Sequence, residues 1–174
     1  AENKELQDRF LQLVTGRDYG CGRKLLSDWD EMMETPMDRI DKILNHDLFL
    51  YHLGRNNAAE ADRRFCRHSM VHFLDVARIG TIKRWSKGLD QPEWIYAAAL
   101  LHDCGKHEQY ENGIPHEQAS ARIAPEILKA CGFNDEETGV IVTAISRHRD
   151  PEAAKEKNLN GILYRADKAR RPCF

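Results

Sequence analysis

A chain of 174 residues, of which 41% are hydrophobic and 31% charged, has the size and composition of one globular domain with a substantial core. Its formal net charge of −2 excludes a general electrostatic attraction to nucleic acids or to anionic membranes. The sequence contains no run of about 18 apolar residues, so no membrane-spanning segment is expected.

The cysteines and the first residues both indicate the cellular compartment. Five cysteines are scattered along the chain and form no C-x-x-C pair, which is typical of reduced thiols rather than of a disulfide framework. The first residues lack the charged-then-apolar order of a secretory signal peptide. We therefore expect a cytoplasmic protein.

Apolar residues recur at helical spacing in three segments near the N-terminus, namely residues 2–15, 25–33 and 35–48. We expect a single domain over residues 1–174, in which residues 1–57 form a helical cover and residues 58–171 form the core. The pair His46-Asp47 falls near the end of the third segment, with no apolar run before it and no glycine after it. We interpret this pair as a helix end.

Residues 58–87 contain no proline and one internal glycine, which predicts a single long helix. His72 lies near the middle of its apolar stripe, and His68 lies one turn earlier at the border of that stripe. A histidine on an apolar face is more often a satisfied core residue than a ligand. His72 therefore indicates a site only if partners lie elsewhere in the chain, and His68 is expected to support it from outside the ligand set.

The most informative motif is the run A-A-A-L-L-H-D-C-G-K at residues 97–106. An apolar helix is expected to begin at Gln91-Pro92 and to end in His102-Asp103, after which a glycine allows the chain to turn and Lys106 follows at once. Small alanines let neighbouring helices approach closely, so this His-Asp pair should lie at the floor of a pocket. Imidazole nitrogens and carboxylate oxygens are ligands for divalent metals.

A polar loop is expected after this motif, at residues 108–113, and His107, which neighbours Lys106, is expected to be exposed. His116 follows a proline at the opening of the next helix, and Pro125 is expected to kink or split that helix. His116 therefore lies at the start of an element that packs against the core.

The last two helices each bring one polar residue to their apolar face. Asn134 caps the first of them, whose inner face ends at His148, and the last begins near residue 160 with Asp167 on its inner side. Residues 152–158 between them are charged and expected to be loose. Sustained apolar–polar alternation is found nowhere in the sequence, so the expected fold class is all-α.

The inward-facing polar residues each lie at a different predicted helix: His72, His102-Asp103, His116, His148 and Asp167. Unpaired polar groups in a core cost a few kcal/mol each, which favours a metal among them. The His102-Asp103 pair with His72 and Asp167 suffices for one ion. With Asp103 as a bridge, His116 and His148 can hold a second ion about 3.5–4 Å away. The alternative is a structural bundle in which these groups satisfy one another.

The order and spacing of these residues resemble the H…HD…D signature of the HD-domain metal-dependent phosphohydrolase superfamily, matched here by His72, His102-Asp103 and Asp167. The resemblance covers roughly residues 64–170. It implies an HD-domain-like helical bundle with extra N-terminal helices, and one or two divalent ions that can be Fe, Mn, Zn, Co, Ni or Mg. It also implies hydrolysis of a phosphomonoester or phosphodiester, with a nucleotide as the expected substrate.

The same resemblance extends to further residues. His116 and His148 match the additional histidines of members that hold two metals, and Lys106 matches a lysine placed to contact phosphate. Members that cleave cyclic dinucleotides carry Gly-Tyr-Pro soon after a His-Glu pair. Here His116-Glu117 is followed by Gln118-Ala119-Ser120, so that specialised activity is not expected.

The expected reaction is attack of a metal-activated water on phosphorus, with Asp103 and Lys106 as the catalytic residues. Lys106 is also expected to bind the substrate. Arg147 and Arg149 flank His148 and are candidates for binding further phosphates, although a solvated helix end explains them equally well.

The expected partner is a small phosphorylated molecule, with neither nucleic acid nor membrane, and the sequence does not indicate an oligomeric state. A basic cluster near the end, Lys168, Arg170 and Arg171, is a weaker candidate for phosphate contact. The alternative function is a non-catalytic, metal-bearing module that senses a nucleotide or regulates another protein. The intact ligand set together with Lys106 favours the enzyme.

Overall fold

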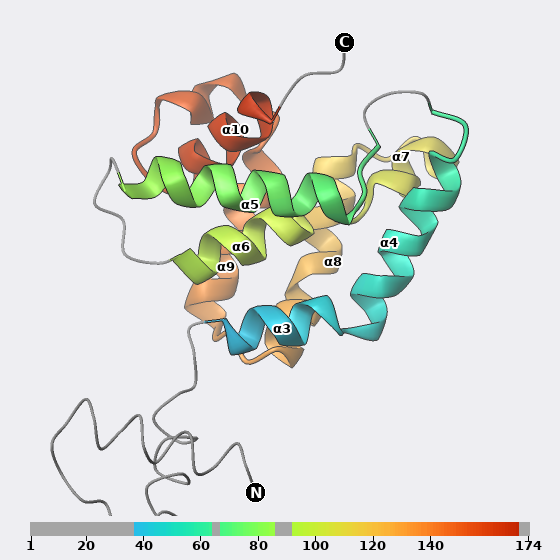
Figure 1. The fold of residues 1–174 in the computed structure, drawn as a ribbon, viewed down its shortest axis with the longest axis horizontal. Coiled ribbons are helices and arrows are strands. Elements are labelled where there is room, and N and C mark those ends of the chain that lie inside the picture. Colours follow the sequence, from blue (N-terminus) through green and yellow to red (C-terminus); the bar gives the residue numbers. More distant parts are fainter. Residues whose placement is uncertain (1–36, 64–66, 86–91, 171–174) are drawn as a thin grey trace, which may run out of the picture. The chain divides into compact units, whose positions relative to one another are not determined.

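The computed structural model describes residues 37–63, 67–85 and 92–170 (Figure 1). The helices predicted at residues 2–15 and 25–33 lie outside these ranges, and so does most of the predicted N-terminal cover. The prediction of a single domain therefore stays a prediction.

The described residues contain helices and no strand, which confirms the all-α prediction. The elements are α3 (Asp38–Leu44), α4 (Asp47–Ala59), α5 (Met70–Trp85), α6 (Pro92–Leu101), α7 (Lys106–Asn112), α8 (His116–Ala130), α9 (Asp135–Arg147), the short 3₁₀ helix η1 (Pro151–Lys155) and α10 (Leu159–Ala169). Within these ranges, every helix is too short or too polar to cross a membrane.

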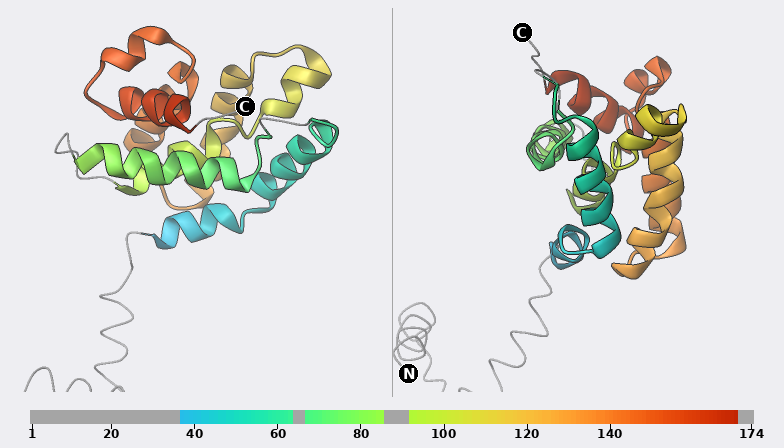
Figure 2. Two further views of the ribbon diagram at one scale, coloured as in Figure 1. Left: turned by 45° about the horizontal axis from the view of Figure 1, so that its top comes forward. Right: turned by 90° about the vertical axis from the view of Figure 1, so that its right-hand side faces the viewer.

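Helix α6 forms the centre of the core. It packs against α3, α5, α8, α9 and α10, and Figure 2 shows α5 and α8 on opposite sides of it. All five side chains from Ala97 to Leu101 are fully buried. Three of them are alanines, which let the surrounding helices approach closely. The residues that follow α6 therefore emerge in the middle of the molecule.

A break at Asn45–His46 divides the predicted third helix into α3 and α4. The Asn45 side chain donates to the Asp41 carbonyl oxygen at 2.8 Å, and His46 Nδ1 accepts from the Leu48 N–H at 3.2 Å. Such local side-chain bonds to the backbone compete with a continuous helix. The pair His46-Asp47 lies at a helix end, as interpreted, because His46 is the N-cap of α4 and Asn45 is the C-cap of α3.

The single helix predicted over residues 58–87 is wrong in its first part, because α4 ends at Ala59 and α5 begins only at Met70. The buried Glu60 carboxylate accepts from the His68 N–H at 2.5 Å and lies 2.6 Å from His68 Nδ1. These bonds bring His68 close to the end of α4. They depend on tertiary contacts, which the absence of proline and glycine does not reveal.

The polar loop predicted at residues 108–113 is mostly a helix, α7, which extends from Lys106 to Asn112. Four of its seven residues are Lys, Glu or Gln, which are good helix formers, and Gly113 ends it with φ 71°, the left-handed conformation common after a helix C-terminus. The polarity of this segment reflects its exposed face rather than a lack of secondary structure.

His107 is buried, contrary to the prediction that it is exposed. Its Nε2 lies 2.8 Å from His52 Nδ1, and its N–H donates to Asn56 Oδ1 at 2.8 Å. Both partners lie on α4, which packs against α7. A pair of stacked imidazoles thus joins these two helices.

The C-terminal half follows the sequence pattern more closely. Asn134 forms a capping box with Glu137 at the start of α9, as predicted for the cap. Pro125 lies inside α8, which is continuous rather than split, and its neighbours Ala124 and Ile127 are fully buried. Residues 151–155, expected to be loose, form η1. Burial of the proline's neighbours offsets the loss of one helical hydrogen bond.

Replacement of Gly161 by alanine is expected to destabilise the fold. A Cβ at this position of α10 would lie 2.0 Å from the Glu156 carbonyl oxygen and 2.8 Å from that of Ala153. We expect Gly161→Ala to lower the free energy of unfolding by about 1–3 kcal/mol, measured by urea denaturation. The matched control Gly139→Ala on α9 meets nothing within 4 Å and should raise it by roughly 0.5–1 kcal/mol. Equal tolerance of both changes would contradict the close approach of α10 to η1.

The imidazole pair predicts a pH-dependent stability. Burial, and then the charge of His107, lowers the pKa of His52 from 6.5 to about 4. Between these two values the unfolded chain binds more protons at this position than the folded chain, so stability is lost as the pH falls. We expect the free energy of unfolding of His52→Gln to fall less steeply between pH 6.5 and 4 than that of the wild type. Urea denaturation at a series of pH values measures both slopes, and identical slopes would contradict the assignment.

Candidate metal centre

His102 and Asp103 continue the turn that ends α6, and both are buried. The His102 N–H donates to the Ala98 carbonyl oxygen at 2.9 Å. The Asp103 carbonyl oxygen accepts from Asn56 Nδ2 at 2.9 Å and from the Lys106 N–H at 3.0 Å. These bonds fix the backbone on both sides of the two side chains, and so fix the directions in which the side chains point.

Gly105 allows this turn to approach α8. Its N–H donates to Ser120 Oγ at 3.0 Å, and a Cβ would lie 2.8 Å from the Ser120 backbone nitrogen. The backbone φ of Gly105 is −86°, which any residue adopts. The sequence predicts this glycine as a turn residue. The structure shows instead that glycine is needed because a Cβ would collide with the backbone of α8.

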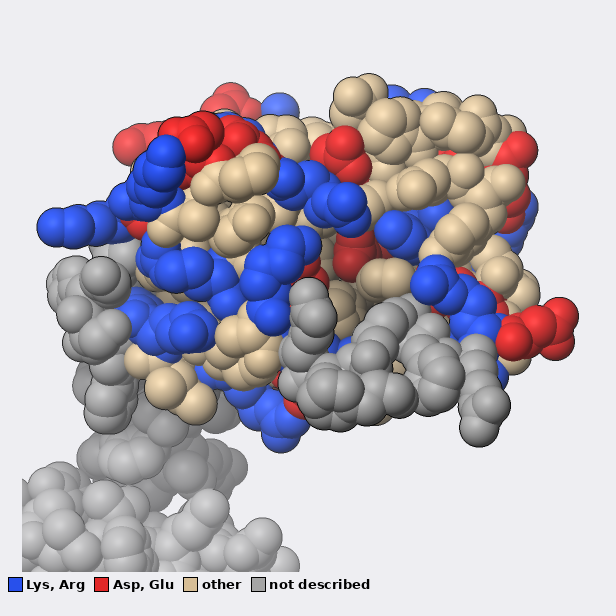
Figure 3. Space-filling view, turned by 90° about the horizontal axis from the view of Figure 1, so that it is seen from above, with Lys and Arg blue, Asp and Glu red and all other residues tan. Residues whose placement is uncertain are grey.

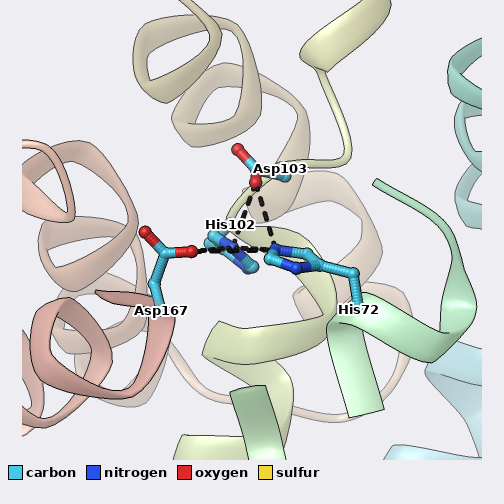
Figure 4. Close-up of side chains that lie close together, drawn as sticks. All are labelled: His72, His102, Asp103 and Asp167. Atoms are coloured by element: carbon cyan, nitrogen blue, oxygen red, sulfur yellow. Dashed lines mark hydrogen bonds and ion pairs between the residues drawn. The ribbon is translucent and has the colours of Figure 1, made fainter. Parts of the chain in front are cut away.

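The first cluster contains His72 from α5, the His102-Asp103 pair and Asp167 from α10 (Figure 4). Asp103 Oδ2 lies 3.2 Å from His102 Nε2 and 3.4 Å from His72 Nε2. Asp167 Oδ1 lies 3.7 Å from His72 Nε2 and 3.9 Å from His102 Nε2. One ligand atom from each residue thus points to a common centre.

The second cluster uses the other oxygen of the same carboxylate. Asp103 Oδ1 lies 3.2 Å from His116 Nε2 and 3.6 Å from His148 Nε2. The two Nε2 atoms lie 3.2 Å from each other. Asp103 therefore lies between the two groups of side chains and belongs to both. That it bridges two ions stays a prediction.

The donor set fits divalent cations. His102 Nδ1 lies 2.7 Å from the Ala99 carbonyl oxygen, and His148 Nδ1 lies 2.6 Å from that of Ile145. A carbonyl can only accept, so each Nδ1 carries a hydrogen, and in the neutral ring Nε2 then directs its lone pair into the cluster. Asp103 Oδ1 is buried without a hydrogen-bond partner. A cation in each cluster would satisfy these lone pairs, which otherwise face one another.

Charge in the clusters follows from burial and from the two carboxylates. Burial lowers the pKa of His72, and it lowers that of His116 to about 3, so both rings are neutral near pH 7. Burial opposes protonation of His102 too, but Asp103 and Asp167 outweigh it and raise the pKa of His102 to about 9. The carboxylates therefore favour positive charge at the first cluster, which a metal ion would provide in place of the proton.

Sequence reasoning missed two residues that orient the site. Glu60 holds His68 so that His68 Nε2 lies 3.6 Å from Asp103 Oδ2. Gln109 Oε1 lies 2.5 Å from His116 Nδ1, which leaves His116 Nε2 to face the second cluster. Both residues lie in segments whose secondary structure was mispredicted, and no local signal distinguishes them from exposed polar residues.

The clusters lie at the base of an open pocket with a cavity volume of about 290 Å³. Lys106 and Arg149 line it, together with Lys168 and Arg170. Arg147 does not, because it is paired with Asp150 and Glu156 at 2.7 Å and 2.5 Å. The structure thus brings together all the predicted site residues except Arg147.

Comparisons with known proteins agree with this geometry. The model of the HD domain family matches residues 70–171, a range that contains every residue of both clusters. A protein of Clostridium beijerinckii, described as uncharacterized, is 46% identical over 139 residues, which cover 79% of this chain and 87% of the relative. No solved structure matches the chain.

Metal content provides the direct test of the two clusters. We expect the wild type to bind divalent metal, His148→Ala to lose the ion of the second cluster, and Asp103→Asn to weaken both, because its oxygens serve both. Elemental analysis after dialysis against Mn²⁺ or Zn²⁺ measures the ions per chain.

The matched control is His46→Asn, which changes the histidine of the other His-Asp pair and keeps a capping side chain at the start of α4. It should retain full metal content. An unchanged content in both His148→Ala and Asp103→Asn would show that the clusters do not bind metal.

Proposed function

The chain belongs to the HD domain family, and we propose that it is a metal-dependent phosphohydrolase. The proposed substrate is a phosphomonoester or phosphodiester, with a nucleotide as the expected class. Asp103 carries the proposal, because its two oxygens face separate sets of imidazoles beneath an open pocket. Two ligand sets that share one carboxylate are typical of two-metal hydrolytic centres.

Bound divalent cations would offset the charge of a phosphoryl group and lower the pKa of an attacking water. The chain's own residues supply the rest. Asp103 and Asp167 hold negative charge at the base of the pocket, and the half-buried ring of His68 covers one side of Asp103. Backbone or side-chain partners fix the rings of His102, His116 and His148, so these parts of the site need little rearrangement on binding.

Lys106 is placed to contact the phosphoryl group. Its Nζ lies 3.2 Å from His116 Nδ1 and 3.4 Å from Gln109 Oε1, and it lines the pocket. Burial lowers the pKa of Lys106, and Asp103 opposes that shift. An ammonium group in this position can donate to a phosphoryl oxygen and stabilise the charge that develops in the transition state.

Hydrolysis assays with the full chain test the proposal. We expect turnover of bis-p-nitrophenyl phosphate, p-nitrophenyl phosphate or a nucleotide in the presence of Mn²⁺, Co²⁺, Fe²⁺, Zn²⁺, Ni²⁺ or Mg²⁺, and loss of turnover with EDTA. Asp103→Ala should abolish activity together with metal content. Lys106→Met should keep the metal and lower kcat by about 10²-fold, because it removes one donor to the transition state.

Two outcomes would contradict the proposal. Activity that survives Asp103→Ala would arise outside this site. Absence of hydrolysis with every metal and substrate, combined with metal content and nucleotide binding, would favour the non-catalytic sensing or regulatory module.

A further inference from the structure

The charged side chains that line the pocket divide into two groups. The two carboxylates, Asp103 and Asp167, belong to the candidate ligand clusters. Every other charged side chain of the lining is basic: Arg67, Lys106, Arg149, Lys168 and Arg170. The chain as a whole has a formal charge of −2, so this concentration of positive charge does not follow from composition.

These five basic side chains, called the basic rim below, come from separate parts of the chain. Arg67 precedes α5, Lys106 begins α7, Arg149 follows α9, and Lys168 and Arg170 lie at the end of α10. Figure 3 shows many Lys and Arg side chains on the face of the molecule that lies at the top of Figure 1. Four separate segments of the chain therefore contribute positive charge to one pocket opening.

Most of the basic rim has no carboxylate partner. Arg67 donates to the carbonyl oxygens of Ala61 and Arg63. Lys106 contacts a glutamine and a histidine, and within the described part of the chain Arg149 has no ion pair. Arg149 also lies close enough to Lys106 for their charges to disfavour each other. An anionic ligand would relieve this repulsion.

The two remaining members are only partly neutralised. Lys168 Nζ lies 3.0 Å from Asp167 Oδ2, whose other oxygen faces the first cluster. Arg170 Nε lies 3.4 Å from Asp75 Oδ2, and Asp75 is also paired with Arg78. Each of these carboxylates is shared, so neither fully offsets its basic partner.

A single phosphate group bound over the ligand clusters needs few of these basic side chains for charge balance. Two divalent cations, the carboxylates of Asp103 and Asp167, and one phosphomonoester dianion would together be neutral. With one divalent cation, two basic side chains complete the balance. In either case, positive charge remains at the opening beyond what a single phosphate group requires.

We infer that the substrate carries at least two phosphate groups, one held over the ligand clusters beside Lys106 and a further one bound by the other members of the basic rim. This inference rests on the proposed function. It favours dinucleoside polyphosphates, nucleoside polyphosphates and other multiply phosphorylated nucleotides over nucleoside monophosphates and cyclic mononucleotides. The cavity volume of about 290 Å³ is small for a ligand pocket, so the phosphates occupy it and the rest of the substrate lies toward the opening.

Calorimetry on the full chain, as purified, tests the inference without requiring turnover. At about 0.15 M salt, tripolyphosphate should bind at least about 10-fold more tightly than orthophosphate. Arg149→Gln should weaken the binding of tripolyphosphate by roughly 5- to 10-fold and leave that of orthophosphate nearly unchanged. Metal content measured before and after the titration separates binding from extraction of metal.

The matched control is Arg147→Gln, two positions away on the same segment and outside the pocket. It should bind tripolyphosphate as the wild type does. Equal affinity of the wild type for orthophosphate and tripolyphosphate, or equal effects of the two arginine substitutions, would overturn the inference.

Hydrolysis with metal then separates this inference from the proposed function. A higher kcat/KM for a nucleoside triphosphate or dinucleoside tetraphosphate than for the monophosphate, reduced in Arg149→Gln, supports both. Turnover of monophosphates and polyphosphates alike, without a preference in binding, overturns the inference and leaves the phosphohydrolase proposal intact. Preferential binding of tripolyphosphate without any turnover supports the inference and contradicts the proposed catalysis.

Discussion

The buried carboxylate of Asp103 is the constraint on which the rest of this structure depends. Its two oxygens face different pairs of imidazoles, and one of them is buried without a hydrogen-bond partner. A buried charge costs several kcal/mol unless it is compensated. Here the imidazole of His102, whose pKa Asp103 and Asp167 raise to about 9, compensates part of that charge. The buried helix α6, the close approach of Gly105 to α8 and the bond from Asn56 hold the Asp103 backbone in place.

The same local device orients a histidine in each cluster. His102 follows the last residue of α6, His148 is the C-cap of α9, and each ring lies against the carbonyl oxygen three residues earlier. The last carbonyls of a helix have no partner within the helix. A histidine in this position satisfies one of them with Nδ1 and presents Nε2 outward. Helix ends thus provide both the hydrogen-bond partner and the direction of the ligand.

The parts of the site that the sequence predicts are those that depend on local pattern. His72, His148 and Asp167 stand out because each is a polar residue on an apolar helical face. In the fold, Asn134 is likewise predictable as a cap because it precedes three acidic residues. The break after Glu60 was missed because it depends on contacts between segments, here with His68.

The distinction between Arg147 and Arg149 was missed for a related reason. Both residues flank His148 in the sequence, and their side-chain directions depend on the turn after α9. There Asp150 binds Arg147 and draws it away from the pocket. Two arginines close in the sequence can therefore differ in whether they line the pocket, because the helix ends between them. The basic rim is built mainly from such segment ends, whereas the ligand clusters are fixed by the packed core. Under the proposed function, substitutions at these segment ends would change which phosphates bind and leave the packed core that positions the clusters in place.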